Sequence, residues 1–232
     1  MNYVISDIHN DNKRLNRLLT EIGFGQEDHL YVLGDLFDRC ISDPDPVGVY
    51  FTLMDLGERC TITLGNHDYW LADYILHYLN LNVRKRRRLK PYYYNSFDLI
   101  LQRLTDVDMK ELAEYILNRP LQLGAEINGI RYLFAHAMTS NPGTREEVYY
   151  YLMAMSDRNE DFYRHGLKGY VSVCGHTQTK NFERYGGRYS VPEFQSIWRN
   201  DDENVIMIDC GCGFKNGKLG CLCIDTGEEY YV

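Results

Sequence analysis

Short apolar runs recur along the chain, and polar residues follow each run at once. Five such runs, rich in β-branched and aromatic residues, lie at 3–6, 30–34, 60–65, 130–135 and 170–175. Runs of this length, bounded by glycine and polar residues, are typical of buried strands. We therefore predict five strands, each of which delivers polar side chains at its carboxyl end.

Helical periodicity fills the first intervals between these strands. In residues 12–22, leucines and an isoleucine recur at spacings of three and four, which gives one apolar face. Residues 45–57 repeat this pattern before the third strand. Strands that alternate with helices in this way indicate βαβ units and an α/β fold. In open sheets of this kind, ligands bind at the carboxyl ends of the strands.

Three longer regions are predicted more coarsely. We predict that residues 69–124 form a mostly helical insertion near the site at the strand ends, with the clearest helix at 109–120, which ends at a proline. Residues 144–165 form a second helical or loop region. Residues 204–225 form two strands around the turn "KNGK", which is a hairpin signal. No linker or internal repeat separates these regions, so we predict a single domain over residues 1–232.

Composition and charge narrow the classes of function. The formal charge of −8 argues against a general nucleic-acid-binding role. We interpret the concentrated basic run Arg84–Lys90 as a solvated surface, with steering of anionic substrates or a nucleic-acid contact as alternatives. No run reaches the ~20 apolar residues that cross a bilayer, and no signal segment precedes the first strand. We therefore expect a cytoplasmic location, no membrane contact and reduced cysteines.

Four of the seven cysteines form two pairs in the tail, Cys210 with Cys212 and Cys221 with Cys223. A structural zinc site is one interpretation. A spacing of two also places both thiols of a pair on one face of a strand, where small apolar side chains pack well. Zinc sites more often have two residues between their cysteines, so we favour packing in the core.

The polar residues after the five strands form short motifs. These are D-x-H at 7–9, G-D-x-x-D-R at 34–39, G-N-H-D at 65–68, a lone His136, and G-H-T at 175–177. Together they offer carboxylate oxygens, an amide oxygen and imidazole nitrogens, a mixture that suits manganese, iron or zinc better than magnesium or calcium. One carboxylate can bridge two ions, and two ions ~3.5–4 Å apart can clamp the attacking and leaving oxygens of a phosphoryl transfer.

These five motifs, in this order, resemble those of the calcineurin-like metallophosphoesterases. Within that family they are similar to the phosphoprotein phosphatase branch, which includes bacterial and phage protein phosphatases and symmetrical diadenosine tetraphosphatases. The tail also resembles the closing strands of that branch, so the resemblance covers most of the chain. It implies a four-layer αββα sandwich of two mixed β-sheets flanked by helices, whereas the βαβ pattern alone also permits a three-layer α/β fold.

The resemblance implies a pair of divalent metal ions, manganese first, with iron or zinc as alternatives. It assigns six ligands: Asp7 and His9 for one ion, Asp35 as the bridge, and Asn66, His136 and His176 for the other. His67 would be the general acid that protonates the leaving oxygen, oriented by Asp38. Arg39 would hold the phosphate, because a guanidinium matches phosphate oxygens in a fork.

The match to the branch is looser at three positions. A second phosphate-binding arginine is expected between the last two metal histidines, and we assign it to Arg158, with Arg145 and Arg164 as alternatives. Cys40 stands where the branch has glycine after the motif arginine, so the backbone there can differ. Met138 stands where the branch has glycine after the fourth motif, and it could narrow the pocket.

The resemblance implies hydrolysis by in-line attack on phosphorus of a hydroxide that bridges the two metal ions, without a covalent intermediate. We predict a Ser/Thr protein phosphatase-like enzyme whose substrate is a phosphorylated protein or peptide. The alternative is a symmetrical diadenosine polyphosphate hydrolase, with a dinucleotide polyphosphate as substrate. A minor alternative is a non-catalytic, metal-containing binding protein, but such a protein has no need of Asp38, Arg39 and His67.

Overall fold

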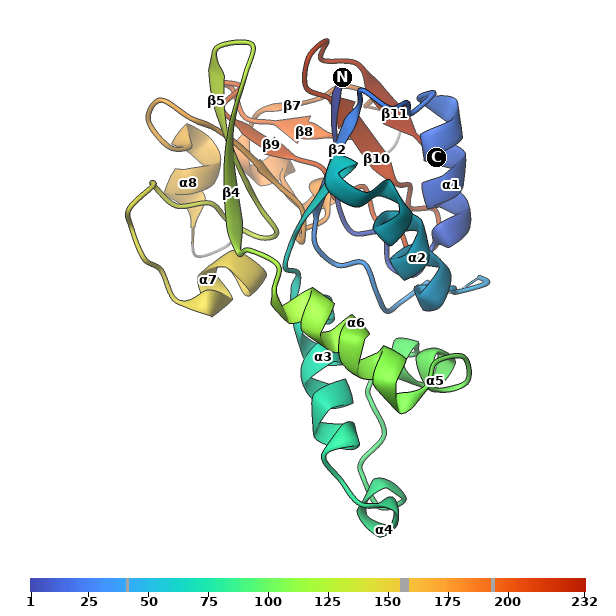
Figure 1. Cartoon of the computed structure of the whole chain (residues 1–232). Helices are drawn as coiled ribbons and strands as arrows, with labels where there is room; N and C mark the ends of the chain where they lie inside the picture. The colour runs from blue at the N-terminus through green and yellow to red at the C-terminus, as the bar shows by residue number, and fades with distance from the viewer. Residues whose placement is uncertain (41, 155–158, 193–194) are drawn as a thin grey trace.

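The computed structural model describes residues 1–40, 42–154, 159–192 and 195–232 (Figure 1). The strands form two mixed sheets. The first sheet has the order β11 (Glu229–Tyr231), β10 (Gly220–Cys223), β1 (Asn2–Ile5), β2 (His29–Leu33) and β3 (Cys60–Thr63). The second has the order β4 (Gln122–Ile127), β5 (Ile130–Ala135), β6 (Val171–Cys174), β9 (Val205–Met207), β8 (Trp198–Arg199) and β7 (Arg188–Tyr189).

Side chains alternate between two faces along each strand, and this alternation creates the layers. In β1, Tyr3 and Ile5 join the core beneath the helices of the first sheet, whereas Val4 joins the core between the sheets. A third core, which includes Trp198, lies on the outer face of the second sheet and contains Phe162. Helices, two sheets and helices therefore form four layers, which confirms the predicted sandwich and excludes the three-layer alternative.

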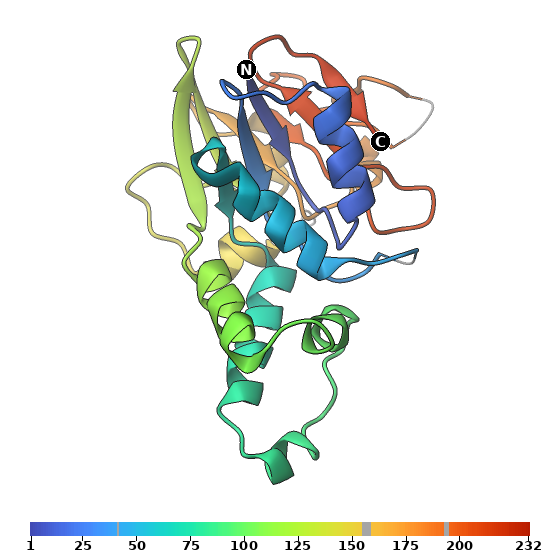
Figure 2. The ribbon, with the colours of Figure 1, turned by 45° about the vertical axis from the view of Figure 1, so that its right-hand side comes forward.

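Two helices cover the outer face of the first sheet (Figure 2). They are α1 (Asn12–Glu21) and α2 (Pro46–Leu56), and an aspartate caps each of them. Asp11 accepts a hydrogen bond from the backbone of Arg14, and Asp45 accepts one from Gly48. On the side of the second sheet lie α7 (Val148–Met153) and α8 (Glu160–His165). No helix in the described ranges is long and apolar enough to cross a membrane.

Four helices form an arm that extends away from the sheets (Figure 1). They are α3 (Asn66–Leu79), α4 (Val83–Arg86), α5 (Ser96–Leu101) and α6 (Asp106–Leu117). We call residues 66–117 the helical arm. Because α3 starts at the end of β3, the base of the arm lies at the edge of the first sheet. The basic run Arg84–Lys90 lies in and just after α4, at the tip.

The predicted hairpin at 204–225 is wrong, because its two strands belong to different sheets. β9 pairs with β6 and β8, whereas β10 pairs with β1 and β11. A tight two-residue hairpin of type I′ needs positive φ at both central residues. Asn216 has a φ of 65°, but Gly217 is not in that region. That turn geometry occurs at Asn128 and Gly129, with φ values of 52° and 78°, between β4 and β5.

The tail cysteines are free thiols in the core. Cys221 and Cys223 of β10 pack toward α1 and α2, and Cys212 joins the same core. Cys210 lies in the core between the sheets. Among the residues that the structure describes, neither group that could hold a metal ion contains a cysteine. The four thiols are thus divided between two cores, as expected for packing rather than for a zinc site.

Candidate metal centre and acid–base pair

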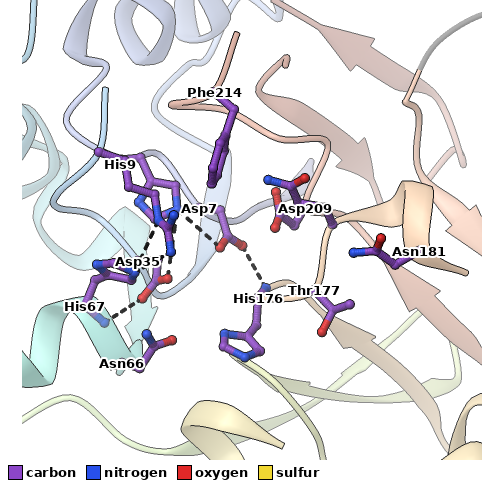
Figure 3. A pocket seen from close by; sticks show the side chains of 12 residues that line it. Asp7, His9, Asp35, Asn66, His67, His176, Thr177, Asn181, Asp209 and Phe214 are labelled. Atoms are coloured by element: carbon purple, nitrogen blue, oxygen red, sulfur yellow. Dashed lines mark hydrogen bonds and ion pairs between the residues drawn. The ribbon is translucent and has the colours of Figure 1, made fainter. Parts of the chain in front are cut away.

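The carboxyl ends of parallel strands from both sheets meet at one edge of the sandwich. β1, β2 and β3 are parallel, and so are β5, β6 and β9. The loops after the strands remain joined by hydrogen bonds, with the backbone N–H of Asp7 donating to Gly34 at 3.0 Å and that of Gly175 to His136 at 2.8 Å. Figure 3 shows the side chains of these loops pointing into one pocket.

Left-handed backbone conformations turn several of these side chains inward. Asp7, His9, Asp35 and His176 have φ values of 55°, 50°, 52° and 63°. Such values are uncommon for residues other than glycine, and they gather at functional sites because the surrounding structure must hold them. Glycine is required at position 65, since a Cβ atom there would collide with the backbone nitrogen and the carboxylate of Asp35.

Two groups of side chains have the geometry to hold a metal ion, and both contain Asp35. In one, ligand atoms of Asp7, His9 and Asp35 lie within 4.8 Å of one another, and the same limit holds for Asp35, His136 and His176. Nε2 of His9 is 4.0 Å from Oδ2 of Asp35, and Nε2 of His136 is 3.3 Å from the same oxygen. The donor set fits two cations that share one carboxylate.

Hydrogen bonds to backbone carbonyls orient the metal-site histidines. Nδ1 of His9 lies 2.9 Å from the carbonyl oxygen of Phe37, and Nδ1 of His136 lies 2.7 Å from that of Leu33. Each Nδ1–H donates to its carbonyl, so Nε2 is the nitrogen that faces the metal groups, and on His136 a bound cation would replace the Nε2 proton. The side-chain amide of Asn66 is 3.0 Å from Nε2 of His136. Asn66 therefore adjoins the second group, as the family resemblance implies.

Burial makes the pocket electrostatically unfavourable without cations. It lowers the pKa of His9 and of His176 to about 3, so these rings stay uncharged near neutral pH. It raises the pKa of Asp7 to about 6, and burial together with Asp7 raises the pKa of Asp209 well above its usual range. Burial also opposes a charge on His136, but Asp35 offsets it and raises the pKa to about 10. Carboxylates this close in a buried site favour bound cations.

Asp38 and His67 form a buried pair beside the metal groups. Nδ1 of His67 is 2.9 Å from Oδ2 of Asp38. The backbone N–H of His67 donates to Oδ1 of Asp35 at 2.9 Å. Arg39 approaches the other ring nitrogen, with Nη2 3.0 Å from Nε2 of His67. The guanidinium lies over the ring of Phe214, 4.8 Å from its centroid. An imidazole ring and a guanidinium thus face the same space as the metal ligands.

Apart from Asp38 and His136, the metal groups, His67 and Arg39 line a cavity of about 290 Å³. The sequence predicted most of its lining, but it missed four residues: Gln178, Asn181, Asp209 and Phe214. Gln178 and Asn181 follow the fifth motif closely, and Asp209 and Phe214 follow β9. The signal was present for Asp209, because it lies just beyond the end of a strand parallel to β6, where the other site residues also lie.

The second phosphate-binding arginine is not located among the described residues. Arg158 lies outside them. Arg145 is exposed and Arg164 bonds to Glu160 at 2.7 Å on α8, and neither lines the cavity. In the described part of the cavity wall, Arg39 is the arginine that faces the metal groups.

Cys40 and Met138 both stand where the branch has glycine, and both side chains are buried. Cys40 is buried, and its thiol donates to the backbone carbonyl of Ser42. Met138 does not narrow the pocket, because it packs in the outer core of the second sheet with Cys174 and Trp198. Asp68, next to the motif histidine, accepts hydrogen bonds from two backbone N–H groups and so braces the loops.

The sequence and the fold both have known relatives. A family model described as calcineurin-like phosphoesterase matches residues 3–207. The symmetrical bis(5′-nucleosyl)-tetraphosphatase of Proteus mirabilis is 32% identical over 120 residues, which is 51% of this chain and 38% of that protein's length. The chain therefore spans well under half of that curated relative.

Solved structures share the fold at low sequence identity. That of a candidate diadenosine tetraphosphatase has a TM-score of 0.65 and 19% identity, and the match covers 100% of this chain and 92% of the other. A protein serine/threonine phosphatase from Saccharomyces cerevisiae has a TM-score of 0.57 and 14% identity, with coverage of 95% and 71%. At these identities the likeness shows the fold alone.

Proposed function

This chain belongs to the calcineurin-like phosphoesterase family, and from that premise we propose that it hydrolyses phosphate esters or anhydrides with a pair of divalent cations. The observation that carries the proposal is the position of Asp35, which belongs to both groups of potential metal ligands. Bound there, the cations would supply Lewis-acid charge that activates water and offsets the charge on the reacting phosphate.

The residues of this chain would have separate tasks. Arg39 would hold the phosphate through its forked N–H groups. In the structure its guanidinium bonds to Nε2 of His67, and we expect it to turn to the phosphate oxygens when substrate binds. Nε2, which accepts from Arg39 in the structure, would then take up a proton from solvent and give it to the leaving oxygen. Asp38 would hold the ring in the right tautomer through Nδ1.

For the substrate we propose a dinucleotide polyphosphate as the first candidate. The curated relative is named a symmetrical tetraphosphatase that acts on bis-nucleosyl compounds. An aromatic rim, formed by Trp70 and Tyr94, gives a physical reason. The two rings lie within 6° of parallel, and they contact the ring of His67 at centroid distances of 5.1 and 4.5 Å. A planar nucleobase on the leaving group can stack on such rings.

A phosphorylated protein or peptide is the second candidate, and the charge of the cavity favours it. A tetraphosphate carries several negative charges, whereas beyond the metal groups the described cavity wall offers one arginine, Arg39, and no lysine. A single phosphate group needs only one such clamp.

The free cysteines support the proposed location in a reducing cytoplasm. We also propose that residues 1–232 act as one domain, because both sheets and the helical arm contribute to the cavity.

A side-by-side assay tests the proposal. The purified protein is stripped of metal, loaded with manganese, iron or zinc, and given diadenosine tetraphosphate, a serine phosphopeptide and p-nitrophenyl phosphate. We expect metal-dependent release of product from at least one of them, with two equivalents of metal per chain at saturation. Absence of turnover with every metal, despite two bound equivalents, would favour the non-catalytic binding protein.

A further inference from the structure

A loop of the helical arm reaches back to the acid–base pair. The chain leaves the tip at α4 and returns toward the sheets before α5 begins (Figure 2). In this loop, the hydroxyl of Tyr92 donates to Oδ2 of Asp38 at 2.8 Å. Nδ1 of His67 lies 2.9 Å from that same oxygen. We propose that Tyr92 is a positioning residue, which acts through Asp38 on proton donation by His67, and the proposal rests on the function proposed above.

The carboxylate of Asp38 has few other restraints. Its side chain is fully buried, and Oδ1 has no hydrogen-bond partner in the part of the chain that the structure describes. Oδ2 therefore carries both side-chain hydrogen bonds, one from His67 and one from Tyr92. Without the tyrosine hydroxyl, the carboxylate could rotate about its last side-chain bond, and the imidazole would turn with it.

Tyr92 is suited to donate this hydrogen bond throughout the useful pH range. Burial and the adjacent Asp38 carboxylate both raise its pKa, so the hydroxyl keeps its proton. Its ring packs at 5.1 Å from that of Tyr74 on α3, which fixes the direction of the hydroxyl. A phenol held in this way places a donor at a constant position, and proton transfer depends on such placement.

The same loop also braces the backbone of the acid–base pair. Asp38 and Arg39 have φ values of 69° and 66°, an uncommon conformation that needs support. The backbone N–H of Asp38 donates to Oγ of Ser96 at 2.7 Å, and the side-chain amide of Asn95 donates to the carbonyl of Arg39 at 3.0 Å. The loop and the first residue of α5 therefore hold main chain and side chain together, and Tyr92 makes their one hydrogen bond to the Asp38 carboxylate among the described residues.

The test is the dependence of turnover on the leaving group, measured with Tyr92→Phe. The variant keeps the ring and deletes the hydroxyl. A general acid matters most when the leaving oxygen is a poor leaving group, so kcat should fall about 10-fold for an alkyl phosphate and less than about 3-fold for p-nitrophenyl phosphate. Both rates come from one sample, so a partly unfolded preparation cannot change their ratio. Tyr93→Phe is the matched control, because that side chain is 86% exposed. Its ratio of kcat for the alkyl phosphate to kcat for p-nitrophenyl phosphate should equal that of the wild type.

A second comparison separates positioning from a general structural role. In a His67→Asn background, Tyr92→Phe should cost nothing further, because both changes remove the same proton transfer. Equal slowing of both substrates, or a further loss in that background, would overturn the proposal for Tyr92. A wild-type protein that binds metal yet hydrolyses no phosphate compound would instead overturn the proposed function.

Discussion

The metal side of the cavity and its leaving-group side differ in how the chain supplies their residues. The metal side consists of Asp7, His9, Asp35, Asn66, His136 and His176. Each of them lies within a few residues of a strand end, so the sheets fix their positions. The leaving-group side consists of His67, Asp38 and Arg39 together with the arm residues Trp70, Tyr92 and Tyr94.

This difference separates residues that follow the strands of the sheets from residues that the arm supplies. Two sheets that meet at one edge leave little freedom for the metal ligands. The arm attaches to the first sheet through α3, and its loop contributes hydrogen bonds and aromatic rings rather than ligands. Metal binding therefore depends mainly on residues at the strand ends, whereas proton donation and leaving-group selection depend on the arm as well. Each prediction below is aimed at one region of the molecule.

The largest effect is expected for Asp35→Ala. This substitution removes the carboxylate shared by both groups, so both equivalents of metal should be lost. Turnover of p-nitrophenyl phosphate should fall by at least about 1,000-fold, since the cations contribute several kcal/mol to transition-state stabilisation. Metal analysis and a turnover assay measure the two losses. Asp43→Ala, at a side chain that is 64% exposed, is the matched control, and it should keep full activity. Retention of both metals by the Asp35 variant would refute the shared site.

A smaller effect, confined to the leaving-group side, is expected for His67→Asn. The metal content should stay at two equivalents, because His67 belongs to neither metal group. With an alkyl phosphate as substrate, kcat should fall about 100-fold, as is typical when a general acid is removed. If the variant loses a metal equivalent in parallel with its activity, His67 is a ligand and the division between the two sides fails.

The sequence pointed to the strand-end residues that the structure brings together, but not to the arm residues Trp70, Tyr92 and Tyr94 beside them, for a physical reason. Strand-end motifs such as D-x-H encode both the strand and the ligand within a few residues. The bond from Tyr92 to Asp38 joins residues 54 positions apart, and no local pattern specifies it. The prediction of a hairpin in the tail was wrong for a similar reason. "KNGK" is a hairpin signal, but β10 pairs with β1 and β9 pairs with β6, so the two strands lie in different sheets. Short motifs in the sequence therefore indicate candidate ligands, whereas the sequence does not indicate which distant residues or strands come together.

A smaller effect still is expected for Trp70→Ala, which alters the aromatic rim and leaves His67 and Asp38 in place. Stacking of one base on an aromatic ring contributes about 1–3 kcal/mol, so kcat/KM for diadenosine tetraphosphate should fall about 10-fold. The value for a serine phosphopeptide should change by less than about 2-fold, because its leaving group has no ring. Equal losses of kcat/KM for the two substrates would show that the rim does not select between them.

The smallest effect is expected at the tip of the arm, where five basic side chains are exposed: Arg84, Lys85, Arg87, Arg88 and Lys90. Their replacement by glutamine should change kcat/KM for small substrates by less than about 2-fold. The 14 residues of α3 place α4, with Arg84 and Lys85, about 20 Å from His67, more than twice the ~8 Å screening length at physiological salt. Lys90 is nearer, because Tyr74 of α3 donates a hydrogen bond to its carbonyl, but its ammonium is exposed to solvent. Arg86 is kept, because it bonds to Asp106 and stabilises the arm. By contrast, Arg39→Gln in the cavity should raise KM at least about 10-fold, as expected when a charged hydrogen-bonding partner of the phosphate is lost. A steep fall of kcat/KM with salt that disappears in the tip variant would mean that the tip steers substrate, and the arm would then serve capture as well as proton donation.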